Sequence, residues 1–272
     1  MNCVVLRFDI RYPWVCGYLP AVQEPWLHLE LLQWSILAVA AVVIGVSKTG
    51  IPGLSILAIM MVALVIPAKQ STGLILPMLI AGDICGVAYY RHHASWGHLV
   101  RLAPWAVVGV LIGAVALGRL SDAQIRPLIG GIVLVLVIGN LGLAQRPAWR
   151  ESLSRSYALA AAIGILAGFT TMVANAAGPI MVIYLLAMGL PKTVFLGTSA
   201  WYFFLLNLFK VPFSAGLGLI TWSSLTLNLL LLPGILLGAW LGVRFAKRMP
   251  EKTFANVAQV LAAVAAVRLL RG

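Results

Sequence analysis

The chain has 272 residues, of which 62% are hydrophobic and 10% are charged, and it carries a formal net charge of +12. A soluble domain usually has about 25% charged residues, and a domain of about 300 residues buries only about 75% of its chain surface. This composition, with basic residues standing singly or in small groups between apolar runs, excludes a water-soluble globular protein and a nucleic-acid-binding surface, and predicts an integral membrane protein.

Apolar runs follow one another along most of the chain, after a mixed, aromatic N-terminal tail at 1–30. A helix needs about 20 apolar residues to cross a bilayer core about 30 Å thick. The runs cover 31–47, 54–66, 70–90, 99–118, 125–143, 156–172, 180–190, 193–212, 222–243 and 253–269. The predicted fold is therefore an all-α, polytopic membrane protein with about eight to ten transmembrane segments.

Two neighbouring pairs of these runs are too short to be ordinary membrane helices. The first pair meets at 47–53 (SKTGIPG), and the second pair meets at 173–179 (VANAAGP). Gly and Pro interrupt helices, and the backbone groups that they free must be satisfied inside the protein. We therefore expect each pair to be a broken helix or a hairpin that does not cross the membrane fully.

Matching residues recur in the two halves of the chain. The matches at a shift of 124 are Pro67 with Pro191, Gly73 with Gly197 and Asp83 with Asn207, and those at a shift of 129 are Pro104 with Pro233, Gly109 with Gly238, Gly113 with Gly242 and Arg119 with Arg248. They predict two membrane repeats, 31–143 and 156–270, joined by a loop at 144–155. Five segments in each repeat would invert the second repeat relative to the first, as in many secondary transporters.

The first break carries a lysine between two hydroxyl residues. Its candidate binding residues are Ser47, Lys48, Thr49, Gly50 and Gly53. A charge at the centre of the bilayer costs about 3 kcal/mol or more, and open helix ends attract anions. We expect this break to bind an anionic group, with Lys48 supplying charge. The alternative is a hairpin tip from which the lysine extends to the membrane surface.

The second break offers neutral polar groups. Its candidate binding residues are Thr170, Thr171, Asn175 and Gly178, and their hydroxyls, amide and open backbone could ligate an oxyanion without adding charge. The alternative is that these side chains only cap the broken helix ends, which Ser, Thr and Asn commonly do.

Three further polar residues stand inside apolar runs. Asp83 could take up and release protons during transport, or it could pair permanently with Lys48 or Lys210, because buried ionisable groups in membranes usually pair. Asn207 and Lys210 are three residues apart and therefore share a helix face. Both are candidate substrate-binding residues, although Lys210 stands near the end of its run and could instead extend to the surface.

The sequence offers little for catalysis. His92, His93 and His98 form a cluster without a nearby Cys, Asp or Glu, which is typical of a loop rather than of a metal site. Nucleophile motifs, a P-loop and a dinucleotide fingerprint are absent. We therefore expect neither an enzyme nor a metal or cofactor.

Several segments together carry a family resemblance. They are 45–53 (GVSKTGIPG), Pro67 to Asp83, 167–179 (AGFTTMVANAAGP), 190–192 (LPK) and 197–199 (GTS). With them the chain resembles, over residues 35–270, the sulfite exporter TauE/SafE family of bacterial membrane permeases. The resemblance implies export of sulfite, sulfonates or related sulfur-containing organic anions across the inner membrane.

These observations lead to one expected function and two alternatives. We expect a multi-pass protein of the bacterial inner membrane, a secondary transporter that exports small anions such as sulfite, sulfonates or related organic acids with proton coupling at Asp83. Its expected partners are the anionic substrate and the lipid bilayer, and a homo-oligomer stays open. The alternatives are a passive anion channel, which needs a continuous polar lining, and a membrane assembly factor or enzyme.

Overall fold

The computed structural model describes residues 29–66, 68–119 and 156–271, and every regular element in them is a helix. In chain order these helices are α1 (Leu31–Thr49), α2 (Ser55–Val65), α3 (Ala68–Tyr90), α4 (Trp96–Arg119), α7 (Tyr157–Ala174), α8 (Ala177–Ala187), α9 (Lys192–Gly216), α10 (Trp222–Arg248) and α11 (Glu251–Arg271). The predicted all-α class is confirmed. Residues 1–28 of the expected tail, the run 125–143 and the loop 144–155 lie outside the described residues.

Six of the described helices are long and apolar enough to cross a membrane, namely α1, α3, α4, α7, α9 and α10. The helices α2 and α8 are apolar but have only 11 residues each, fewer than the roughly 20 that a full crossing needs. Large apolar side chains such as Leu64 and Trp222 are 81% and 87% exposed on the outer surface. Lipid, rather than water, is the solvent that suits such a surface.

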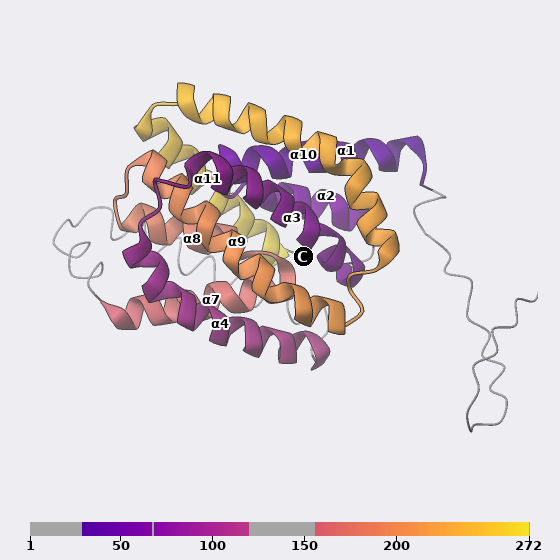
Figure 1. Cartoon of the computed structure of the whole chain (residues 1–272), viewed down its shortest axis with the longest axis horizontal. Helices are drawn as coiled ribbons and strands as arrows, with labels where there is room; N and C mark the ends of the chain where they lie inside the picture. Colours follow the sequence, from indigo (N-terminus) through magenta and orange to yellow (C-terminus); the bar gives the residue numbers. More distant parts are fainter. Residues whose placement is uncertain (1–28, 67, 120–155, 272) are drawn as a thin grey trace, which may run out of the picture.

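The helices pair across the two predicted repeats (Figure 1). Helix α1 lies along α10 on one side of the molecule and α4 lies along α7 on the other, with α3 and α9 in contact between these pairs. Because α1 and α7 begin the two predicted repeats, while α4 and α10 are the fourth described helices of each, the two pairings are counterparts. Two similar halves related by a two-fold axis would make these contacts, and the inverted repeat remains our prediction.

Glycines allow the paired helices to approach closely. A Cβ added at Gly238 of α10 would collide with the backbone of Val42 in α1, and one added at Gly168 of α7 would collide with the backbone of Ala106 in α4. Small residues permit such close backbone contact between membrane helices. The two outer helix pairs therefore flank α3 and α9, which contact each other between them.

Candidate functional site

Both predicted breaks interrupt helices, and they touch each other. Between α1 and α2 the chain turns at Gly53, whose φ of 90° is left-handed. Asn175 ends α7 with a φ of 53°, in a left-handed conformation that Asn adopts more readily than most residues. A Cβ added at Gly178 would lie 3.8 Å from Gly53 Cα, so the first turn of α8 contacts the break between α1 and α2.

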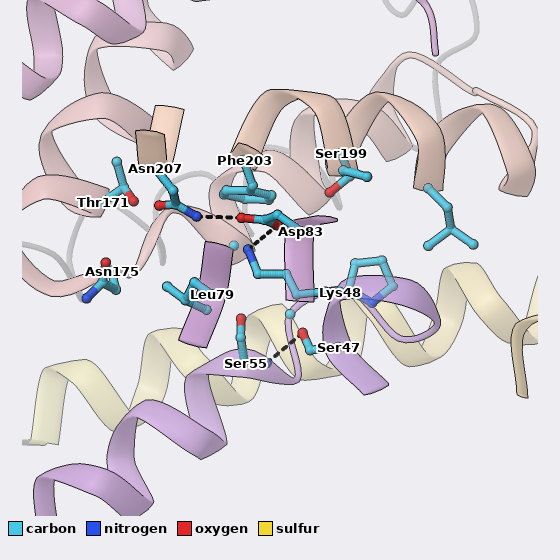
Figure 2. Close-up of a pocket in the computed structure, with 15 residues that line it drawn as sticks. Ser47, Lys48, Ser55, Leu79, Asp83, Thr171, Asn175, Ser199, Phe203 and Asn207 are labelled. Atoms are coloured by element: carbon cyan, nitrogen blue, oxygen red, sulfur yellow. Dashed lines mark hydrogen bonds and ion pairs between the residues drawn. The ribbon is translucent and has the colours of Figure 1, made fainter. Parts of the chain in front are cut away.

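A small polar cavity lies where the two breaks meet α3 and α9 (Figure 2). Its volume is about 20 Å³, which is enough for a single water molecule. The residues that line it are Ser47, Lys48, Pro52, Gly53, Ser55, Leu79, Asp83, Thr171, Asn175, Gly178, Leu196, Ser199, Ala200, Phe203 and Asn207. A ligand of several heavy atoms could enter only after these elements move apart.

Lys48 and Asp83 form an ion pair in this cavity. Lys48 Nζ lies 2.8 Å from Asp83 Oδ1, and the two side chains are 9% and 0% exposed. The ammonium also lies over the ring of Phe203, 4.3 Å from its centroid. Beside Asp83, Gly82 leaves room for the lysine, since an added Cβ there would lie only 2.9 Å from Lys48 Cγ. Lys48 therefore does not extend to the membrane surface, and its charge is matched by a carboxylate.

Asn207 binds the other oxygen of the same carboxylate. Its Nδ2 donates to Asp83 Oδ2 at 2.7 Å, as Figure 2 shows. These two residues are the pair that the shift of 124 residues matches between the halves. If the two halves are related by a two-fold axis, the axis would pass close to this hydrogen bond, at the centre of the site.

Lys210 is buried behind the cavity wall and does not reach the membrane surface. Its side chain is 1% exposed, and its Nζ donates to Asn175 Oδ1 at 2.6 Å and to Thr171 Oγ1 at 3.1 Å. The sequence suggested a position near a helix end because Pro212 follows, but α9 continues through Pro212 to Gly216. Lys210 thus contacts residues that line the cavity without lining it itself.

Three other candidate residues lie away from the cavity. The Thr49 hydroxyl donates to the carbonyls of Gly45 and Ala239, and so joins α1 to α10. Gly50 faces the backbone of Gly242, which again is a packing contact. The Thr170 hydroxyl donates to carbonyls of its own helix, at 2.8 Å and 3.2 Å. Thr49 and Gly50 thus contribute to helix packing and Thr170 bonds within its own helix, and none of the three lines the cavity.

The structure adds cavity residues that the sequence analysis missed. Ser199 and Phe203 line the cavity from α9, and Ser55 lines it at the start of α2. Ser199, Phe203 and Asn207 are spaced by four residues, so they follow one face of a helix. The spacing of four residues before Asn207 is therefore the sequence signal that indicates Ser199 and Phe203.

The histidine cluster does not contribute to the cavity lining. His92 and His93 are exposed at the turn between α3 and α4, whereas His98 Nδ1 lies 2.9 Å from the hydroxyl of Tyr184. Within the described residues, no three His, Cys, Asp or Glu side chains gather as a metal site would require.

The site carries more positive than negative groups. Lys48 and Lys210 contribute two ammonium groups and Asp83 contributes one carboxylate, which leaves one formal positive charge. Helices α2 and α8 both begin beside the cavity; at α2 the Ser47 hydroxyl accepts from the N–H of Ser55, whereas the N-cap residue of α8 makes no side-chain cap. Helix N-termini favour anions, so this arrangement is suited to binding a small negatively charged group.

An all-helical membrane protein with a small site of charged, polar and apolar side chains at two broken helices has the architecture of a polytopic membrane permease. The family model described as Sulfite exporter TauE/SafE matches residues 37–269, and the chain therefore belongs to that family. Neither the curated proteins nor the solved structures include a match to this chain. The resemblance inferred from the two breaks is confirmed.

Proposed function

We propose that the protein is a secondary transporter that exports small anions across the bacterial inner membrane, with the cavity between the two breaks as its binding site. The observation that carries this proposal is the cavity itself, where Lys48, Thr171 and Asn207 meet the N-terminal ends of α2 and α8. Sulfite and sulfonates are the first candidates because the family is described as sulfite exporters.

The small size and mixed lining of the cavity favour a transporter over a channel. A channel needs a continuous polar lining, whereas here a volume of about 20 Å³ is bounded by Leu79, Leu196 and Phe203 as well as by polar groups. Movement of one repeat against the other would open the cavity to each side of the membrane in turn, as in other transporters with broken helices.

Asp83 is the proposed proton-coupling residue. Its carboxylate pairs with the Lys48 ammonium and accepts from Asn207, and so it occupies two donors that a bound oxyanion would need. Protonation would remove the charge of Asp83 and release both donors for the anion. Binding of the proton and of the anion would then favour each other, because such coupling is reciprocal. The two would leave the cell together, with the outward concentration gradient of the anion as the driving force.

The proposal can be tested by anion flux in liposomes that contain the purified protein. The substrates would be sulfite, sulfate, methanesulfonate and acetate, each with and without an imposed proton gradient. We expect flux of at least one anion, faster when it leaves the more acidic compartment. Flux of every anion that ignores the gradient would refute the coupling and favour a passive conduit.

Two variants locate the site in the same assay. Lys48→Ala should lose most of the flux, whereas Asp83→Asn should retain flux but lose its response to the proton gradient. Lys252→Ala is a matched control, because Lys252 is exposed on α11. Full flux in Lys48→Ala would show that the anion binds elsewhere.

A further inference from the structure

Lys210 contacts three residues of the cavity wall at once. Its Nζ lies 3.1 Å from Thr171 Oγ1, 2.6 Å from Asn175 Oδ1 and 3.3 Å from Asn207 Oδ1. A lysine ammonium has three hydrogens and no acceptor, so each contact uses an oxygen of a residue that lines the cavity. Lys210 can therefore fix the orientation of these three polar side chains.

Both asparagine side chains have a fixed orientation. Asn207 Nδ2 donates to Asp83 Oδ2 at 2.7 Å, and Asn175 Nδ2 donates to the carbonyl of Thr72 at 3.2 Å. Turning either amide around would place an N–H against the Lys210 ammonium and an oxygen against another acceptor. Each oxygen therefore faces Lys210, and each amide nitrogen faces away from it.

The same contacts determine what the wall can offer to a ligand. With their oxygens turned to Lys210, Asn175 and Asn207 each keep a second amide hydrogen, and Thr171 keeps its hydroxyl hydrogen. Lys48 adds an ammonium, which is also a donor. Asp83, the carboxylate of this wall, already pairs with Lys48 and accepts from Asn207, whereas the hydroxyls of Ser47, Ser55 and Ser199, which also line the cavity, can both donate and accept.

We propose that Lys210 is a positioning residue that turns this wall into a set of hydrogen-bond donors, and so selects ligands whose bound group presents only acceptor atoms. The inference rests on the proposed function, since it concerns the same cavity. It also separates two effects of the site: the charge attracts an anion, whereas the donor pattern rejects a group that carries its own N–H or O–H, even when that group is neutral.

Three ligands of similar shape separate these effects. Methanesulfonate is an anion with acceptor oxygens only, dimethyl sulfone is neutral with acceptor oxygens only, and methanesulfonamide is neutral with an added N–H donor. Binding of methanesulfonate to the purified protein would be measured by calorimetry, and the two neutral compounds would be tested as competitors. We expect dimethyl sulfone to compete at least about tenfold better than methanesulfonamide, since each unsatisfied buried polar group weakens binding.

Variants then test the role of Lys210. Lys210→Gln should bring the ratio between the two neutral competitors close to one, because a glutamine can accept as well as donate. Asn175→Asp keeps a partner for the ammonium but adds an acceptor to the wall, and should shift the ratio towards methanesulfonamide. Lys252→Gln, at an exposed position, should keep the wild-type ratio. A general loss of structure would instead abolish methanesulfonate binding, so the ratio is compared only in variants that still bind methanesulfonate.

The outcomes distinguish this inference from the proposed function. If the wild-type protein binds methanesulfonate but the neutral compounds compete equally, the inference is overturned and the anion site stands. The inference also fails if the Lys210→Gln or Asn175→Asp protein keeps the wild-type ratio. If the wild-type protein binds none of methanesulfonate, sulfite, sulfate and acetate, the proposed function itself fails.

Discussion

The two buried lysines of the site differ in what surrounds their charges. Lys48 pairs with the Asp83 carboxylate and lies over an aromatic ring, whereas Lys210 donates to neutral oxygens. Removing one partner of a buried ion pair leaves an uncompensated charge in a medium that solvates it poorly. The stability of the site should therefore depend more on the match between Lys48 and Asp83 than on either residue alone.

A double-mutant cycle on this pair tests the point. Lys48→Met leaves Asp83 without its cation and should destabilise the protein by about 3–5 kcal/mol. The double variant Lys48→Met/Asp83→Asn should recover much of this loss, because it removes both charges. Thermal unfolding in detergent would measure these two variants and the single variant Asp83→Asn, with Lys252→Met as the exposed control. Strictly additive effects of the two substitutions would contradict the ion pair.

The sequence identified most polar residues of the site but not their partners. Asp83 and Lys48 were recognisable because charges are costly in lipid, but whether Asp83 pairs with Lys48 or with Lys210 depends on how helices distant in sequence pack. Lys210 was hardest to place. A proline two residues later suggested a helix end, yet prolines are tolerated inside membrane helices whose neighbours satisfy the freed backbone groups.

At the scale of elements, two features build the site: helices that stop at the breaks and helices that pack without intervening side chains. The breaks were predictable because their causes are local, namely Gly, Pro and an Asn that adopts a left-handed conformation. The packing of α1 on α10 was not, since it depends on contacts between residues about 190 positions apart, such as Thr49 with Ala239.

Alanine at a packing glycine tests this arrangement. Gly168→Ala and Gly238→Ala should each destabilise the protein by about 1–3 kcal/mol, because the added methyl group meets the backbone of the neighbouring helix. In Gly216→Ala, at the end of α9, the added Cβ meets nothing within 4 Å, so stability should be unchanged or slightly higher. The comparison uses thermal unfolding in detergent. Equal stability of all three variants would contradict the close helix packing.

At the scale of the whole molecule, residues matched by the predicted duplication have matching environments. Gly73 of α3 abuts Leu219, between α9 and α10, and Gly197 of α9 abuts His93, between α3 and α4. Asp83 and Asn207, the matched polar pair, bond directly to each other. This arrangement supports two similar halves around one central site, which is the architecture that alternating exposure requires.

A transporter of this design needs no chemistry from the histidine cluster. Changing His92, His93 and His98 together to alanine should leave anion flux unchanged, although the loss of the His98–Tyr184 contact should lower stability by about 1 kcal/mol. Flux in liposomes and thermal unfolding measure the two effects separately. Loss of flux in a folded triple variant would favour a reactive or metal-dependent role for the cluster.

The central claim is that a small anion binds between the two breaks, and a bromine-labelled anion tests it most directly. The protein would be crystallised with bromomethanesulfonate, and the bromine located from its anomalous scattering. The account predicts a peak in an enlarged cavity bounded by Lys48, Thr171 and Asn207. A protein that transports this anion but shows the bromine only at another position would contradict it.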